Sequence, residues 1–394
     1  MKYDFETLVS RKEAGSHKWN AMYKNNPQLE DDIVPFSVAD MEFKNAPEII
    51  EGLKEYLDTH IMGYTGATES YYESVLDWMQ LRHGFRPKKE WIVETAGVVP
   101  AIYQMVQSFT EPEDGVMIMT PVYYPFSEAV VRSGRRLVET ELKNNSGYYE
   151  IDFMDFEGKA SRDDVKMLIL CSPHNPIGRI WTREELTRIA QICIRHHVFI
   201  ISDEIHADLI LPGYEHVSMG TLGDNYLDNC AICTAPSKTF NLAGFQTSNI
   251  LIPNGVCRNK LTKARGYFSL NILGYQACEL AYRRAGEWLE ELLLVLDKNK
   301  KMVDNFFEEK FPMFPVSPLQ GTYLIWIDFR AMGLKPKELE KFMQEKASLY
   351  FDEGYLFGKA GEGFERMNIA CPTAVLEAAL KRLEKALKEA GFKG

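Results

Sequence analysis

Short runs of consecutive apolar residues alternate with helix-like segments through the middle of the chain. The runs cover residues 116–119, 167–171, 198–201, 230–234 and 249–252, and polar or proline-containing turns end several of them. Between the runs, apolar residues recur every three or four positions, as in the segment that begins at the capping box Thr182–Glu185. Buried strands that alternate with amphipathic helices predict an α/β domain with a mainly parallel sheet.

The segments before and after this alternation of predicted strands and helices have a different pattern. Helices are predicted from Pro47 and over 69–82, with a glycine-containing loop at 63–66 between them. After about residue 276, long charged helices are predicted over 278–310, followed by strands near 323–329 and 366–369. Because 394 residues exceed what one core commonly serves, we expect a large domain over 47–285. A smaller α+β domain is expected from residues 1–46 and 286–394.

Composition narrows the class of protein. Hydrophobic residues make up 45% of the chain, which excludes wholesale disorder, and the net charge of -11 disfavours a nucleic-acid or anionic membrane partner. No apolar run is long enough to cross a bilayer, and the first residues lack the apolar core of a signal peptide. We therefore expect a cytoplasmic enzyme.

The seven cysteines are odd in number and scattered, which is typical of reduced thiols in a cytosol. Cys230 and Cys233 form a C-x-x-C pair, but no second pair or histidine cluster accompanies them. Their spacing also suits a buried strand. No metal site is predicted.

The stretch Thr234–Gly244 carries the most informative chemistry. It begins where the apolar residues 230–233 stop, and it contains Lys238. A lysine at the mouth of a buried strand lies in low dielectric, which lowers the pKa of its amine and makes it a nucleophile. Such amines carry pyridoxal 5′-phosphate (PLP) in many enzymes. The alternative is an ordinary surface lysine.

Further polar residues follow neighbouring strands. Tyr123, Asn175, Asp203 and Lys238 each lie in the turn after a predicted strand. Ligands of open α/β sheets bind beyond the carboxyl ends of the strands. One cleft is therefore expected to gather all four side chains.

These motifs resemble those of fold type I PLP-dependent enzymes, and within them the MalY/PatB group of cystathionine β-lyase-like C–S lyases. The resemblance implies a PLP-dependent transferase-like large domain. The Asn-Pro-x-Gly and Ser-Lys motifs are shared with aminotransferases, whereas Asp-Glu-Ile-His and Gly-Val-Val-Pro are more particular to the lyases. The matching segments are 38–43, 63–64, 97–100, 121–126, 173–178, 202–209, 237–244 and 366–372.

By this resemblance, several residues bind the cofactor ring. Asp203 would meet the pyridine nitrogen, and Asn175 would hydrogen-bond the ring hydroxyl, with the substrate carboxylate as a further partner. Tyr123 would lie flat on the ring, with its neighbour Tyr124 as the alternative. His206 would lie near the ring hydroxyl, where aminotransferases more often have tyrosine. Each could instead be a turn, capping or packing residue.

The phosphate group requires hydrogen-bond donors. Gly97, Val98 and Val99 offer backbone N–H groups at a predicted helix start, where an anion is favoured. Ser237 adds a hydroxyl. The resemblance implies that Tyr64 reaches the phosphate of the partner subunit, so that a homodimer with shared active sites is expected. Tyr64 could also be a plain surface aromatic.

Two departures from the family pattern weaken the phosphate assignments. Many relatives have an arginine after the lysine, but Phe245 and Gln246 stand here, and Ala235 replaces a serine that some members have. Relatives also often continue Cys-Pro-Arg near the C-terminus, where this chain has Cys-Pro-Thr, ending at Thr373.

The resemblance also implies substrate contacts. Arg366 would anchor the α-carboxylate of an amino acid, because a guanidinium offers a bidentate fork. Arg179 is the next candidate for this role. Ala39 and Asp40 would line the substrate entrance, and Tyr124 would contact the substrate.

The implied activity is α,β-elimination on L-cystathionine and related cysteine derivatives, giving a thiol, pyruvate and ammonia, with Lys238 as the base that removes the Cα proton. This is the reaction of cysteine-S-conjugate and cystathionine β-lyases. An aminotransferase is the first alternative. A PLP-dependent regulator is the second, although the chain has no basic helix-turn-helix extension. The preferred thiol and the pathway are not determined by the sequence.

Overall fold

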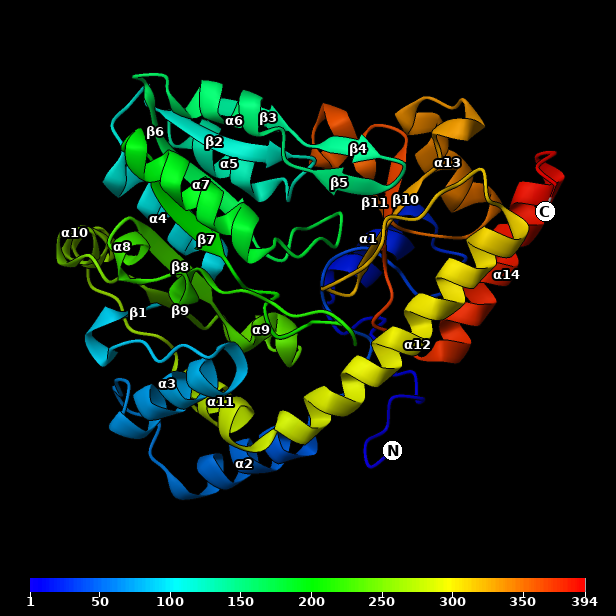
Figure 1. Ribbon diagram of the computed structural model, residues 1–394. Coiled ribbons are helices and arrows are strands. Elements are labelled where there is room, and N and C mark those ends of the chain that lie inside the picture. Colours follow the sequence, from blue (N-terminus) through cyan, green and yellow to red (C-terminus); the bar gives the residue numbers. More distant parts are fainter. Residues whose placement is uncertain (394) are drawn as a thin grey trace.

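A seven-stranded sheet forms the centre of the larger part of the molecule (Figure 1). The computed structural model describes residues 1–393. The strand order is β1-β9-β8-β7-β6-β2-β3, and only β9 pairs antiparallel with its neighbours. The predicted, mainly parallel sheet is therefore confirmed. Its strands are β1 (Ile92–Thr95), β2 (Gly115–Thr120), β3 (Arg136–Glu141), β6 (Val165–Cys171), β7 (Phe199–Asp203), β8 (Cys230–Thr234) and β9 (Ser248–Leu251).

Alternate residues of the strands enter two different cores. Val116 and Ile118 pack into a cluster with helices α4 and α10, whereas Met117 and Met119 face a cluster that contains α6 and α7. Both faces of the sheet are thus covered, which explains why the strands read as continuous apolar runs. The helices of this part are α2 (Pro47–Thr59), α3 (Glu69–His83), α4 (Val98–Phe109), α5 (Pro125–Arg132), α6 (Phe153–Ala160), α7 (Arg183–Arg195), α8 (Asp224–Leu227), α9 (Pro236–Thr239), α10 (Gly255–Arg265) and α11 (Ile272–Arg284).

A second, three-stranded sheet lies at the other end of the molecule (Figure 1). Its order is β10-β12-β11, with antiparallel pairing throughout. The long helix α12 extends from the α2–α11 side of the molecule to this sheet, and α14 packs beside it. The elements are α1 (His17–Asn25), α12 (Gly286–Lys310), β10 (Leu324–Asp328), α13 (Pro336–Lys346), β11 (Asp352–Glu353), β12 (Phe364–Asn368) and α14 (Thr373–Glu389).

We propose that the division expected at residues 46 and 285 separates the two domains. The helical stretch predicted over 278–310 is interrupted at Ala285, which lies between α11 and α12. The hairpin of β4 (Lys143–Asn145) and β5 (Tyr148–Glu150) was not predicted. It contacts the small sheet, where Trp326 Nε1 donates to the hydroxyl of Tyr149 at 3.1 Å.

Among residues 1–393, no helix combines the length and apolarity that crossing a membrane requires.

The face of the small sheet beneath α13 holds two carboxyl groups. Glu353 on β11 lies directly opposite Glu365 on β12, and Glu365 is buried with one carboxyl oxygen unpaired. Burial raises the pKa of Glu353 to about 7 and raises that of Glu365 well above its usual value, and the pair repel each other. Like charges directly opposite on paired strands destabilise a sheet.

Glu365→Gln is therefore expected to stabilise the protein in alkaline solution. The folded protein holds the Glu365 proton above pH 4.5, where the unfolded chain begins to release it, so the wild type loses stability as pH rises from there through the raised folded pKa. At pH 8 the variant should gain about 1–3 kcal/mol in the free energy of unfolding. Urea unfolding at pH 5 and pH 8 measures the difference. The exposed Glu345→Gln on α13 is the control, and an equal gain in both variants would contradict the assignment.

Candidate active site

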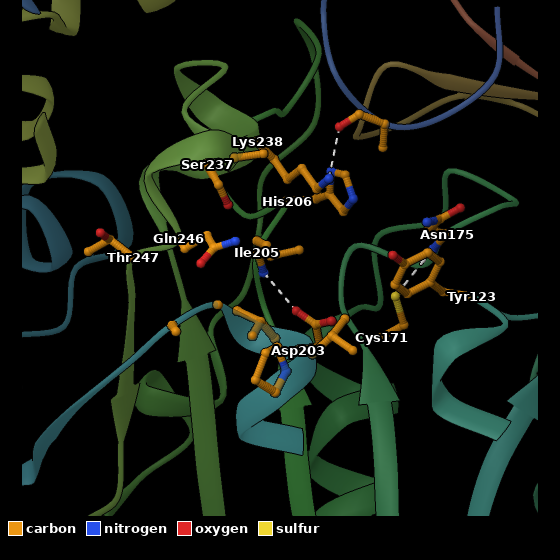
Figure 2. A pocket seen from close by; sticks show the side chains of 17 residues that line it. Tyr123, Cys171, Asn175, Asp203, Ile205, His206, Ser237, Lys238, Gln246 and Thr247 are labelled. Atoms are coloured by element: carbon orange, nitrogen blue, oxygen red, sulfur yellow. Dashed lines mark hydrogen bonds between the residues drawn. The ribbon is translucent and has the colours of Figure 1, made fainter. Parts of the chain in front are cut away.

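A pocket opens at the carboxyl ends of the parallel strands, where the sequence predicted a cleft. Its empty space amounts to about 760 Å³, including the solvent at its open mouth. It brings together residues from five turns that follow β1, β2, β6, β7 and β8 (Figure 2). The predicted residues that line it are Ala39, Gly97, Val98, Val99, Tyr123, Asn175, Asp203, His206, Ser237 and Lys238.

Lys238 lies in the one-turn helix α9, directly after β8. Its Nζ donates a hydrogen bond to the carbonyl oxygen of Ala39 at 2.8 Å. Burial lowers the pKa of the amine to about 8, while the carboxylates of Asp40 and Asp203 oppose this shift. A substantial fraction of the amine is therefore neutral near pH 8, which is the form that acts as a nucleophile or base.

Asp203 ends β7 and points into the same pocket (Figure 2). Its Oδ1 accepts the backbone N–H of Ile205 at 3.1 Å. Burial raises the pKa of this carboxyl to about 7, although Lys238 draws it down. It forms no salt bridge with any other residue in 1–393, so its charge is available to a cationic ligand.

His206 projects from the loop after β7 beside Lys238 (Figure 2). Its Nδ1 is buried and unpaired within the described chain, and burial lowers its pKa well below the usual value. The ring stands edge-on to Tyr323 at 6.0 Å between centroids. The Tyr323 hydroxyl donates to the Ala39 carbonyl at 2.8 Å, the same oxygen that receives Lys238. Tyr323 was not singled out in the sequence, because nothing local distinguishes it from a core tyrosine.

Asn175 links the pocket to Arg366. The Nη1 group of Arg366 donates to Asn175 Oδ1 at 2.9 Å, and its Nη2 pairs with Asp352, the residue opposite it on β11. Arg366 is buried, and burial lowers its pKa to about 10. Its Nε has no partner within residues 1–393. The sequence did not reveal Asp352, whose pairing depends on the register of two strands distant in sequence.

The start of α4 supplies donors to the opposite wall of the pocket. Gly97 precedes the helix with φ of 113°, a backbone region that suits glycine. The N–H groups of Val98 and Val99 belong to the first helical turn, where no intrahelical acceptor exists. Pro100 follows and has no N–H of its own. The helix dipole favours an anion at this point.

Ser237, Gln246 and Thr247 also line the pocket (Figure 2). Figure 2 shows the Ser237 hydroxyl and the Gln246 amide facing the same space. Gln246 was recognised in the sequence only as the residue that replaces an arginine, and Thr247 was not recognised. Their place in the turn that leads into β9 was the available signal.

Ala39 and Asp40 differ in their surroundings. Ala39 lines the pocket, whereas the carboxylate of Asp40 forms salt bridges with Arg11 and Lys18 at 2.8 Å. Asp40 instead borders a neighbouring groove. Its expected role at the entrance stays a prediction, and its carboxylate is already paired within the chain.

Tyr124, Tyr64, Arg179 and Arg366 lie outside the pocket lining of this chain. Tyr124 packs on Phe357, over which the Arg366 guanidinium lies 5.0 Å from the ring centroid. Tyr64 is fully exposed in the loop between α2 and α3. Arg179 is buried, and all three of its guanidinium nitrogens donate within the chain, to Tyr149, Ile180 and Glu185, whereas Arg366 keeps its Nε unpaired.

The residues present fit pyridoxal phosphate. An amine with a lowered pKa suits its aldehyde, and the unpaired carboxylate of Asp203 suits a protonated ring nitrogen. The donors at the start of α4 and the Ser237 hydroxyl suit a phosphate group. We propose these roles for the residues that line the pocket.

Comparison with known proteins gives one family and several close relatives. The model of the family described as aminotransferase class I and II matches residues 31–383. The chain is 41% identical over 359 residues to cystathionine beta-lyase PatB of Bacillus subtilis, which covers 90% of this chain and 93% of PatB. It is 28% identical to protein MalY of Escherichia coli, covering 98% and 99% of the two chains.

Solved structures agree with this family. Cystalysin from Treponema denticola, whose crystal structure contains a pyridoxal 5′-phosphate cofactor, is 49% identical with a TM-score of 0.97, covering 99% of this chain and 100% of cystalysin. The PLP-bound C-S lyase from Staphylococcus hominis is 30% identical with a TM-score of 0.91, covering 98% of each chain.

Proposed function

Since the chain belongs to the aminotransferase class I and II family, and within it to the MalY/PatB group of PLP-dependent fold type I enzymes, we propose that it is a carbon–sulfur β-lyase. The reaction is the α,β-elimination of a thiol from L-cystathionine or a related cysteine derivative, with pyruvate and ammonia as the other products. One observation carries the proposal: the Lys238 amine and the Asp203 carboxylate line a single pocket beside His206.

The residues of the site would bind different groups of the substrate and the cofactor. Arg366, fixed by Asp352 and Asn175, would bind the substrate α-carboxylate. Asp203 would hold the cofactor by its ring nitrogen, with the Asn175 amide group near the ring hydroxyl and Tyr123 against the ring face. The start of α4 and Ser237 would hold its phosphate. When bound, the cofactor withdraws the electrons left by a broken Cα–H bond.

Lys238 is the base in this mechanism. Its neutral amine removes the proton from Cα of the substrate, and the Cβ–S bond then breaks with its electron pair on sulfur. The thiolate takes up a proton and leaves. Water converts the remaining three-carbon enamine to pyruvate and ammonia.

Product analysis tests the function. The purified holoenzyme is incubated with L-cystathionine, with and without an added 2-oxo acid. A β-lyase should release stoichiometric thiol and pyruvate without the 2-oxo acid. Consumption of amino acid that depends on the 2-oxo acid, without thiol release, would show an aminotransferase instead.

Arg366→Lys should raise the KM for the amino acid far more than it weakens cofactor binding. Lysine keeps the charge but loses the bidentate fork, so about 1.5–3 kcal/mol of binding is at stake and KM should rise roughly tenfold to hundredfold. Arg179→Lys is the matched control, because Arg179 is similarly buried but pairs with Glu185, whereas Arg366 donates to the pocket residue Asn175. If the control raises KM and Arg366→Lys does not, the carboxylate anchor is misassigned.

The proposed enzyme is a homodimer in which Tyr64 of one chain reaches the other chain's site. The loop that carries Tyr64 also exposes Ile61 and Met62, apolar side chains that a second copy would cover. All seven cysteines are free, which supports a cytoplasmic location. The shared-site arrangement makes a direct test possible.

Mixing inactive Lys238→Ala chains with impaired Tyr64→Ala chains should restore activity. Half of the randomly exchanged dimers are mixed and hold one intact site each, so about a quarter of wild-type sites should return. Subunit exchange is verified by native mass spectrometry. The control mixes Lys238→Ala with Asp203→Ala, whose lesions both fall in a chain's own pocket, and it should recover nothing. If exchanged Tyr64→Ala mixtures stay inactive, Tyr64 does not serve the partner's site.

A further inference from the structure

The loop after β7 presents side chains to both of its sides. Asp203 and His206 face the pocket (Figure 2), whereas Glu204 and Asp208 are not part of its lining and are buried, at 2% and 7% exposure. Two buried carboxylates on one short loop require strong partners, because an unpaired buried charge is costly. Each of them has a histidine partner.

Glu204 is held by its own region of the chain. It accepts from His216 Nε2 at 3.2 Å, from the backbone N–H of Met219 at 2.9 Å and from the Ser202 hydroxyl at 3.1 Å. All of these partners lie within 202–219. Glu204 therefore braces this segment but does not reach the lysine helix.

Asp208 connects three separate segments. Its carboxylate accepts from Trp78 Nε1 at 3.1 Å and pairs with His83 Nε2 at 3.0 Å, both on α3. It also accepts from the Thr239 hydroxyl at 2.8 Å. Thr239 is fully buried and directly follows Lys238. One carboxylate thus joins the loop of Asp203 and His206 to the helix of Lys238.

The lysine helix needs such support from outside. Helix α9 has four residues, too few for a stable helix of its own. Its position relative to the β7 loop decides where the Lys238 amine lies with respect to Asp203 and His206. The Thr239–Asp208 hydrogen bond is a direct side-chain link between these two segments, and α3 holds the Asp208 end of it in place through His83 and Trp78.

We propose that Thr239 and Asp208 are positioning residues, whose hydrogen bond sets the place of the Lys238 amine relative to Asp203 and His206. The role in turnover rests on the proposed function, whereas the placement of Lys238 beside a bound cofactor does not. A displacement of the base by about an ångström is enough to slow a reaction roughly hundredfold. Arg366 lies on the other domain's sheet, so binding of the substrate carboxylate is expected to persist when this bond is lost.

Thr239→Val tests the proposal, since it keeps the side-chain shape and removes only the hydroxyl. Thr239→Ser keeps the hydroxyl, and Thr239→Ala is the second variant that lacks it. Thr140→Val is the matched control, because Thr140 is also buried and donates to a carboxylate, that of Asp155, at the same 2.8 Å, but does not line the pocket. Each holoenzyme is measured by visible circular dichroism of the bound cofactor, by melting temperature and by kcat and KM.

Thr239→Val and Thr239→Ala should weaken the visible circular dichroism and lower kcat about tenfold to hundredfold, with KM changed little. Thr239→Ser and Thr140→Val should retain both properties. If Thr239→Val and Thr140→Val lose melting temperature equally and show wild-type circular dichroism and kcat, Thr239 supports only the fold and the proposal is overturned. Failure of Thr239→Ser to restore the signal also overturns it. A wild type that releases no thiol, with circular dichroism that still separates the variants, refutes only the proposed function.

Discussion

Replacing Lys238 with alanine is expected to abolish thiol release from L-cystathionine. The side chain is the one primary amine among the residues that line the pocket, and burial lowers its pKa to about 8, so no other lining residue offers an amine to attach the cofactor and remove the Cα proton. Loss of a positioned general base lowers turnover roughly 10²–10⁴-fold, and loss of the point of cofactor attachment adds to this. Steady-state thiol release by the purified variant, saturated with cofactor, measures the loss.

Chemical rescue sharpens this experiment. A small primary amine such as methylamine should restore part of the rate to Lys238→Ala, because it can enter the space that the side chain leaves and accept the proton. Lys263→Ala, at an exposed position on α10, serves as the control and should keep wild-type activity without added amine. Wild-type turnover by Lys238→Ala in the absence of amine would refute the central assignment of the site.

Asp203→Asn should produce the second largest loss. The amide has the shape of the carboxylate and can still accept the Ile205 N–H, but it carries no charge to keep a ring nitrogen protonated. Removing one preorganised electrostatic contact from a buried site lowers kcat roughly 10²–10³-fold. The measurement is kcat for thiol release together with the cofactor dissociation constant, which should rise in parallel.

Two further variants distinguish the loss of the Asp203 charge from a general loss of folding or stability. Asp203→Glu restores the charge at a displaced position and should recover part of the rate. Asp164→Asn removes a carboxylate paired with Arg136 at the opposite end of the sheet and should leave both constants unchanged. Equal activity of Asp203→Asn and the wild type would mean that the ring nitrogen needs no acidic partner in this enzyme.

Local patterns were enough to predict the central sheet and one wall of the pocket. Continuous apolar runs arise because both faces of a parallel sheet are buried, and the residue after such a run must emerge at the carboxyl edge. The sequence alone therefore places Asp203 and Lys238 near each other, and the pocket contains both. The start of α4 could also be predicted from the sequence, since Gly97 precedes an apolar helix pattern.

Residues that act through distant pairing could not be found in this way. Asp352 meets Arg366 only because β11 and β12 pair in one register, and a shift of one residue would place Glu353 there instead. Tyr323 donates to the Ala39 carbonyl, which lies 284 positions earlier in the sequence, and Lys238 donates to the same oxygen. No local pattern reveals that Asp40 pairs with Arg11 and Lys18.

The sequence by itself determined the fold class and the chemistry of the candidate site. Strand periodicity and turn residues are properties of short segments, and the order of the motifs is read directly along the chain. None of them depends on how the chain packs. Only the tertiary structure decided which charges are paired and which remain available. Glu204, Asp208 and Asp352 are all buried carboxylates with side-chain partners, whereas the carboxylate of Asp203 accepts only the backbone N–H of Ile205 within residues 1–393. That difference depends on what the fold packs against each side chain, because burial and the nearest opposite charge set the state of an ionisable group.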